Sequence, residues 1–371
     1  MANPRTLVIV GSFLAEEKGV YGGVARSCQT LMQSSFADRF NIITVDSTQI
    51  SNPPPGTFKR FLLAVKRMYV FLTQVIKHKP DALVLFASVG LSFVEKSVMA
   101  WLGRALGCHT FIFPRGGKLI DQTTQSPLRY HLARYLFKGA HEFLSQGQSW
   151  SDFAIQEMGF VESRVHLIPN WTATKIHLAL GAERGFSSND MPKLLFVGWL
   201  EEFKGVFELL RAVKNLHDAG YEMSLTLAGR GNAEEAAKAF IKEHGLEGVI
   251  TFAGWVEADS LEILLRENNV FVLPSWAEGL PNSMIEAMAC GLAVVVSDVG
   301  IISDFVEDQK HALLVTKKNA QSLEQALKRV IEDPEVRIRL AKNGYQLAAK
   351  QFSVEVVVQK FGDVIDASCY R

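Results

Sequence analysis

The sequence predicts two doubly wound α/β domains, each built around a parallel β-sheet. Short β-branched or apolar runs alternate with longer amphipathic stretches, the pattern of strands joined by crossover helices. This pattern occurs twice, with an irregular stretch between the two series. The chain of 371 residues is also too long for one ordinary core and suits two domains of middling size.

Twelve short runs predict strands, six in each half of the chain. In the first half they are residues 6–10, 40–45, 81–86, 109–113, 142–145 and 164–168. In the second half they are residues 194–198, 224–229, 249–254, 270–274, 293–297 and 312–315. The helical patterns between them favour parallel pairing in both sheets.

Residues 171–192 lose this periodicity and end in Ser187-Ser188-Asn189-Asp190, which predicts an interdomain linker. We therefore expect an N-terminal domain at 1–175 and a second domain at 190–352. Residues 353–371 are expected to form a helix that packs back on the first domain. In doubly wound sheets ligands bind beyond the carboxyl ends of the strands, so we expect a cleft between the domains there.

Composition is that of a soluble globular protein, with 48% hydrophobic and 21% charged residues. The four cysteines show no C-x-x-C pair, which favours a reduced, cytoplasmic setting. The net charge of zero hides a division: residues 1–178 carry 19 Lys+Arg and 11 Asp+Glu, and residues 179–371 carry 20 and 28. An anionic partner on the N-terminal side would explain this division, and so would chance variation in surface charge.

The segment from Pro274 to Ala289 follows a strand of buried type. Asn282 or Ser283 is a suitable N-cap, and Gly291 is expected to end the helix near Cys290. The amides and positive dipole end of such a helix form a site for a diphosphate.

Two carboxylates belong to this segment. Glu278, in the loop before the helix, is either a solvated acid or an acceptor of hydrogen bonds from sugar hydroxyls. Glu286, expected in the first turn, either reaches a ribose diol or closes a capping box with Ser283.

A cation is expected after the strand that ends at Gly198. A helix begins near Gly205, so Lys204 is placed to project into the cleft. A fixed cation there would stabilise the negative charge of a departing diphosphate more than the ground state. The other interpretation is a solvated lysine at a helix start.

Glu278 and Glu286 have seven residues between them and lie within Pro-Ser-x-x-Glu-Gly and Glu-Ala-Met-Ala-x-Gly. This pattern resembles the E-x7-E motif of the family 4 retaining glycosyltransferases. The resemblance implies the GT-B fold, two Rossmann-like domains facing across a cleft. It implies that Glu278 holds the donor sugar and Glu286 the ribose, and that backbone amides at Gly279, Leu280 and Asn282 contact the donor. Residues 197–205 resemble the family's G-R-L-x-x-x-K-G segment, which implies contacts from Gly198 and Lys204 to the diphosphate.

The main departure from that segment is Trp199, where the family usually has an arginine that pairs with the diphosphate. Two arginines are candidates to replace its charge: Arg115, which follows a strand of the first half, and Arg230, which lies in a Gly-x-Gly strand end. Arg115 is the preferred candidate, because the resemblance places it near the reaction centre.

Gly22 and Gly23 lie between the first strand and the first helix, where paired glycines allow close backbone approach to a ligand. The family carries a Gly-Gly loop here, which implies a contact with the donor. Taken without the resemblance this signal is weak, because it is not a G-x-G-x-x-G fingerprint.

Residues 58–76 predict a helix with apolar residues along one stripe and basic pairs, Lys59-Arg60 and Lys66-Arg67, on a shared face. The segment is either a basic amphipathic helix on an anionic membrane or an ordinary packed helix.

The family implies transfer of a sugar from a nucleotide-diphosphate sugar to a saccharide or lipid-linked saccharide, as in bacterial surface polysaccharide assembly. No Asp-x-Asp occurs and the histidines lack metal-ligand spacing, so we expect no metal and no other cofactor. No nucleic-acid partner is expected. Two alternatives remain, a nucleotide-sugar 2-epimerase on the same fold and a non-catalytic relative that acts as a binding partner.

Overall fold

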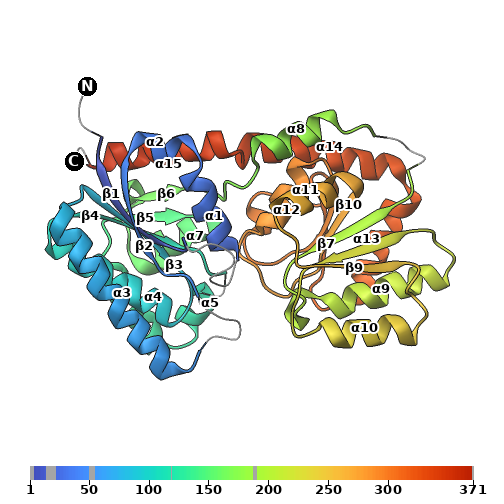
Figure 1. Cartoon of the computed structure of the whole chain (residues 1–371), viewed down its shortest axis with the longest axis horizontal. Coiled ribbons are helices and arrows are strands. Elements are labelled where there is room, and N and C mark those ends of the chain that lie inside the picture. Colours follow the sequence, from blue (N-terminus) through green and yellow to red (C-terminus); the bar gives the residue numbers. More distant parts are fainter. Residues whose placement is uncertain (1–3, 14–21, 50–54, 118, 187–189, 370–371) are drawn as a thin grey trace. The chain divides into compact units, whose positions relative to one another are not determined.

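The computed structural model describes residues 4–13, 22–49, 55–117, 119–186 and 190–369. The chain forms two compact units, each with one parallel six-stranded sheet (Figure 1). Unit 1 comprises residues 1–172 and 354–371, and unit 2 comprises residues 173–353. Each unit is described by itself below.

The sheet of unit 1 has the strand order β2-β1-β3-β4-β5-β6. Its strands are β1 (Thr6–Gly11), β2 (Asn41–Asp46), β3 (Ala82–Ala87), β4 (His109–Pro114), β5 (Glu142–Ser145) and β6 (Val165–Leu167). Its helices are α1 (Gly23–Met32), α2 (Ser35–Arg39), α3 (Thr57–His78), α4 (Leu91–Ala105), α5 (Leu119–Thr124), α6 (Pro127–Phe137), α7 (Gln148–Asp152), η2 (Phe153–Met158), η3 (Glu162–Arg164) and α15 (Val354–Cys369).

The sheet of unit 2 has the strand order β12-β11-β10-β7-β8-β9. Its strands are β7 (Lys193–Val197), β8 (Ser224–Ala228), β9 (Ile250–Gly254), β10 (Val270–Leu273), β11 (Ala293–Ser297) and β12 (Leu313–Val315). Its helices are α8 (Lys175–Glu183), η4 (Glu202–Lys204), α9 (Val206–Asp218), α10 (Glu234–Glu243), α11 (Ala258–Glu267), α12 (Asn282–Ala289), η5 (Ile302–Asp304), α13 (Ala320–Glu332) and α14 (Pro334–Gln351).

The predicted α/β class with two parallel sheets is confirmed, and each of the twelve predicted runs overlaps one strand. The predicted linker at 171–192 is wrong in its middle, because α8 occupies 175–183; residues 187–189 lie outside the described residues. This helix buries only His177 and Gly181, too few positions to produce a helical period in the sequence. Gly181 lets α8 approach closely, since a Cβ there would lie 2.2 Å from the carbonyl oxygen of Ala289.

Successive side chains along the strands of unit 1 point to opposite faces of the sheet. Leu7, Ile9 and Val84 share one core with α1, α2 and the C-terminal helix α15, to which α15 contributes Phe361. Leu83, one residue along β3, contacts the opposite side, where a Cβ added to Gly103 of α4 would meet it. The C-terminal segment is therefore part of the core of unit 1 (Figure 1).

The helix predicted at 58–76 is confirmed as α3, which packs on β1, β2 and α4 with part of its apolar stripe. Only Phe71 and Val75 of α3 are buried. Much of its apolar stripe is exposed, namely Phe58, Phe61, Leu62, Val65, Tyr69 and Ile76. Among the described residues, no helix is long and apolar enough to span a membrane.

Candidate functional site

The candidate site of unit 2 lies at the carboxyl edge of its sheet. Strands β7 and β10 are parallel neighbours, so the loops that follow Val197 and Leu273 leave the sheet at the same edge. The first loop carries Lys204 in η4, and the second carries Glu278. The two predicted residues are 74 positions apart in the sequence and are brought into contact by this pairing.

Lys204 and Glu278 form an ion pair in which Nζ of Lys204 lies 2.6 Å from Oε1 of Glu278. Their side chains are 17% and 12% exposed, so both are largely shielded from water but can still be reached by a ligand. The hydroxyl of Ser275, which is fully buried, donates to the same Oε1 at 2.7 Å. Glu278 is therefore held by two donors and is not a freely solvated loop acid.

Helix α12 begins one residue earlier than expected. Pro281 is its N-cap, with φ −68° and ψ 122°, and its side chain makes no capping hydrogen bond. The expectation of Asn282 or Ser283 as N-cap is wrong, because the fixed φ of proline ends the extended loop at Pro281 and Asn282 is already helical. The predicted end of the helix is confirmed, with Cys290 as C-cap and Gly291 at φ 72°.

Glu286 is the fifth residue of α12 and is only 4% exposed. The capping-box interpretation is wrong, because the N-cap Pro281 has no N–H for a carboxylate to bond. The buried position of Glu286 near the start of α12 is compatible with the predicted contact with the ribose.

Four glycines bring the loops of this edge into close backbone contact. A Cβ on Gly205 would lie 2.1 Å from the Pro274 carbonyl oxygen, and one on Gly300 would lie 2.2 Å from that of Glu278. A Cβ on Gly229 would lie 1.8 Å from the Gly198 carbonyl oxygen, and one on Gly231 would lie 2.2 Å from that of Leu200. The loops after β7, β8, β10 and β11 are thus packed together at a spacing that only glycine permits.

Two predicted residues, Gly198 and Arg230, lie where β7 and β8 end. The amide of Gly198 donates to the carbonyl of Ala228, and the amide of Leu200 donates to the carbonyl of Arg230 at 2.9 Å. The Arg230 side chain is exposed and makes no ion pair with any described residue. Trp199, which stands where the family has arginine, packs against Trp255 with ring centroids 5.3 Å apart.

Three further residues at this edge were not predicted. Nε1 of Trp276 donates to Oε1 of the buried Glu208 at 3.2 Å, and Nζ of Lys318 lies 4.2 Å from the centroid of the Trp276 ring. Oε2 of Glu208 is buried and has no hydrogen-bond partner among the described residues. In the sequence Glu208 is one acid in an amphipathic helix, the usual mark of a solvated face, so only the fold could single it out.

Gly22 and Gly23 belong to unit 1. Gly22 is the N-cap of α1, in an extended conformation with φ −144°, and Gly23 is the first residue of the helix. A Cβ on Gly22 would meet nothing within 4 Å, so its role there does not depend on close packing. Leu280 and Gly279 lie in unit 2 directly before α12, where Gly279 accepts from the amide of Ile301.

Arg115 and Gly23 are linked through Ser27. Nη2 of Arg115 donates to the Ser27 hydroxyl at 2.7 Å, and that hydroxyl donates to the carbonyl of Gly23 at 3.0 Å. The guanidinium lies over the rings of Phe113 and Trp171, and its Nη1 is buried without a hydrogen-bond partner among the described residues. Burial lowers the pKa of Arg115 to about 10, so the group remains charged at neutral pH.

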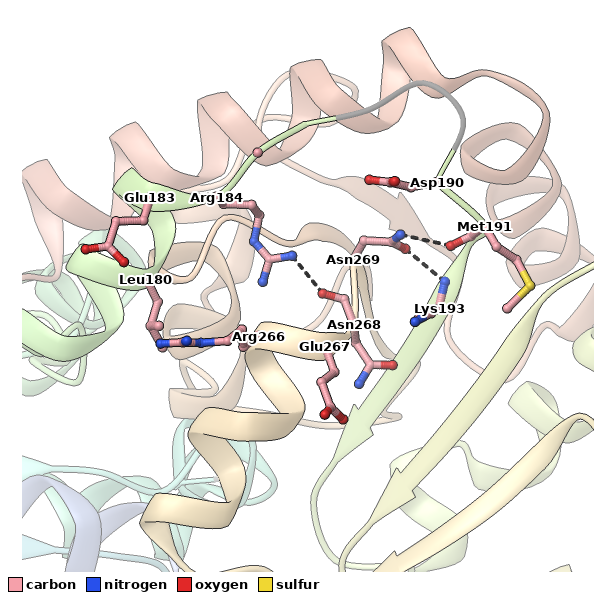
Figure 2. Close-up of a pocket in the computed structure, with 11 residues that line it drawn as sticks. Leu180, Glu183, Arg184, Asp190, Met191, Lys193, Arg266, Glu267, Asn268 and Asn269 are labelled. Carbon is pink, nitrogen blue, oxygen red and sulfur yellow. Dashed lines mark hydrogen bonds between the residues drawn. The ribbon is translucent and has the colours of Figure 1, made fainter.

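A cavity of about 560 Å³ lies at the opposite, amino edge of the sheet of unit 2 (Figure 2). Lys193 and Asn269 line it at the amino ends of β7 and β10, and Arg184 donates to the carbonyl of Asn268 at 2.9 Å. None of the predicted site residues lines this cavity. Within the described ranges no group of three or more His, Cys, Asp or Glu side chains is arranged to hold a metal ion.

Gly300→Ala is expected to displace the Glu278 loop. Gly300 has φ 64°, and its added Cβ would collide with the backbone of Glu278. We expect a loss of roughly 1–3 kcal/mol or more in the stability of unit 2, the usual cost of forcing a side chain into such a conformation.

Hydrogen exchange read by mass spectrometry would measure this loss in the peptides of unit 2. Gly248→Ala is the matched control, because its Cβ would meet nothing within 4 Å and its φ is not positive. Equal exchange in Gly300→Ala and the wild type would contradict the packing described above.

Comparison with known proteins finds a family model that is similar to most of unit 2. Residues 183–347 match the model of the glycosyl transferases group 1. A Campylobacter jejuni protein named N,N'-diacetylbacillosaminyl-diphospho-undecaprenol alpha-1,3-N-acetylgalactosaminyltransferase is 29% identical over 63% of this chain and 62% of its own length. The lipopolysaccharide core biosynthesis glycosyltransferase LpsE of Rhizobium meliloti is 27% identical over 56% of this chain and 59% of its own length. The chain thus spans less than two thirds of the length of these curated relatives.

Solved structures share the fold over nearly the whole chain. Sucrose-phosphate synthase from Thermosynechococcus elongatus superposes with a TM-score of 0.79 at 18% identity, covering 98% of each chain. Anabaena HepE in complex with UDP and glucose gives a TM-score of 0.72 at 18% identity, covering 98% of this chain and 100% of its own. The two parallel α/β units therefore have the GT-B fold. The match to the group 1 glycosyl transferases covers residues 183–347, which lie within unit 2.

Proposed function

We propose that the chain transfers a sugar, with retention of its anomeric configuration, from a nucleotide-diphosphate sugar to a saccharide or lipid-linked saccharide. The observation that carries the proposal is the contact of Lys204 with Glu278 beside the start of α12. At one sheet edge, a cation and a helix N-terminus match the diphosphate of such a donor, and a carboxylate matches its sugar hydroxyls.

The donor would rearrange the contact between Lys204 and Glu278. Glu278 would accept hydrogen bonds from the sugar hydroxyls, while Nζ of Lys204 turns to the phosphate oxygens as they gain negative charge. The bond between C1 of the sugar and the phosphate oxygen breaks, and an acceptor oxygen bonds C1 on the same face. The acceptor proton passes to the departing phosphate, so no enzyme nucleophile is required.

The other donor contacts follow from position. Glu286 would bind the ribose, and the backbone of Gly198, Gly279, Leu280 and Asn282 would surround the diphosphate. Within unit 2, Arg230 is exposed, unpaired among the described residues and hydrogen bonded through its backbone to the Trp199 loop. We propose that it supplies the charge that Trp199 lacks. Arg115, Gly22 and Gly23 are the proposed contacts from unit 1.

An acceptor carried on a lipid agrees with the exposed apolar face of α3, which carries Lys59, Arg60 and Lys66 beside it. We propose that this face rests on an anionic membrane surface on its cytoplasmic side. The names of the relatives include a diphospho-undecaprenol substrate and lipopolysaccharide core synthesis. Assembly of a bacterial surface polysaccharide is the proposed role.

Lys204→Ala is expected to lower turnover by about 10²–10³, as removal of one preorganised partner of the transition state commonly does. The donor is first chosen by thermal shift among UDP-, GDP- and ADP-sugars, and release of nucleoside diphosphate is then measured with an acceptor extract. Lys242→Ala, an exposed lysine of α10, is the control with the same loss of charge. An unchanged rate in Lys204→Ala would remove Lys204 from the mechanism. Conversion of the donor without any acceptor would favour the 2-epimerase.

Activity is expected to persist in excess EDTA, because Lys204 and the start of α12 supply the positive charge that a metal ion supplies elsewhere. The measurement is the rate of nucleoside diphosphate release before and after chelation. Recovery of a lost rate on adding Mg²⁺ or Mn²⁺ back would contradict the metal-free proposal.

A further inference from the structure

The loop that carries Glu278 is connected to the segment that carries Lys204 by their ion pair and also through Trp276. The amide of Trp276 donates to the carbonyl of Phe203 at 2.8 Å. Its indole Nε1 donates to Oε1 of Glu208 at 3.2 Å. Phe203 and Lys204 belong to η4, and Glu208 lies in the first turn of α9, which follows directly. The indole therefore joins the Glu278 loop to the start of the helix behind Lys204.

The position of Glu208 in α9 does not explain its side chain. With Gly205 as N-cap, Glu208 is the third helical residue, where a glutamate often bonds back to the amide of the N-cap. That amide already donates to the carbonyl of Glu202 at 2.9 Å. Glu208 is only 7% exposed, and its Oε2 has no hydrogen-bond partner among the described residues. A carboxylate buried with one neutral donor costs stability that an apolar side chain would not, which points to a role for its contact with Trp276.

The ring of Trp276 is restrained from a third loop as well. Lys318, between β12 and α13, places its Nζ 4.2 Å from the centroid of the indole. The indole thus has a carboxylate at its N–H edge and an ammonium group near its ring, and both interactions are favourable for an aromatic side chain of this type. Because Glu208 and Lys318 come from different elements, the ring cannot turn without losing one contact or the other. This restraint is independent of the ion pair between Lys204 and Glu278.

That independence matters when a donor binds. In the proposed function Lys204 turns to the phosphate oxygens and Glu278 to the sugar hydroxyls, so their mutual contact is lost, whereas the bonds of Trp276 involve neither side chain. We propose that Glu208 is a positioning residue: by holding the indole of Trp276, it keeps Glu278 in place after the donor has separated the two charges. The inference rests on the proposed function for the reaction that it serves, but the positioning is a property of the free protein.

Hydrogen exchange by mass spectrometry on the full chain, without donor, tests the positioning. Glu208→Ala is expected to speed exchange about five- to tenfold in peptides covering residues 274–281, because a lost buried hydrogen bond lets this loop open more often. Glu208→Gln should exchange as the wild type does, since its amide oxygen still accepts from the indole. Glu243→Ala, an exposed glutamate of α10, is the control with the same loss of charge.

Three results of this experiment would overturn the proposal. The first is unchanged exchange of residues 274–281 in Glu208→Ala. The second is equal acceleration in Glu208→Ala and Glu208→Gln, which would make the charge and not the contact with the indole responsible. The third is faster exchange throughout unit 2, which would show a general loss of stability.

Steady-state kinetics with the donor tests whether the positioning acts through Glu278. Glu208→Ala is expected to lower kcat about tenfold in the otherwise wild-type protein, because a small displacement of a group that holds the substrate is costly. In a Glu278→Ala background the further loss should be less than about twofold, since no carboxylate is left to position. Equal fold-losses in both backgrounds would contradict the proposal. Absence of any turnover by the wild type would count against the proposed function, whereas the exchange experiment would still decide on the positioning.

Discussion

The contact between Lys204 and Glu278 depends on one feature of the topology, the direct pairing of β7 with β10 in a parallel sheet. The two side chains are 74 positions apart in the sequence, and this pairing brings both loops to one edge. An isolated lysine and glutamate on the surface would contribute little to stability. Here both are largely shielded, and Ser275 restrains the carboxylate as well, so the pair is held in place before any ligand arrives.

The surrounding loops are arranged to keep that pair in position. Gly205 and Gly300 allow the backbones on either side of Glu278 to approach within distances that a Cβ would forbid. The amide of Trp276 also donates to the carbonyl of Phe203 at 2.8 Å, which joins the two loops that carry the pair. Rigid positioning of this kind is what stabilisation of a developing charge requires, because the dipoles need no reorganisation during the reaction.

The sequence predicted the strands well because buried parallel strands form apolar runs that need no tertiary information to recognise. It predicted the start of α12 poorly, since Asn282 and Ser283 are better N-caps by type than Pro281, and the loop geometry decides between them. Helix α8 was missed because its burial is confined to two positions. The burial of Glu208 and the exposure of the apolar stripe of α3 depend on which elements pack against each helix. The local sequence pattern does not contain this information.

We propose that the donor binds where Lys204, Glu278 and the start of α12 meet. Hydrogen exchange by mass spectrometry, with and without the nucleotide-diphosphate sugar that stabilises the protein most, tests it directly. We expect slower exchange in peptides covering residues 198–205 and 274–286, with exchange at residues 190–193 and 266–269, on the amino edge, unchanged. Protection confined to the amino edge, or absent from residues 274–286, would contradict it.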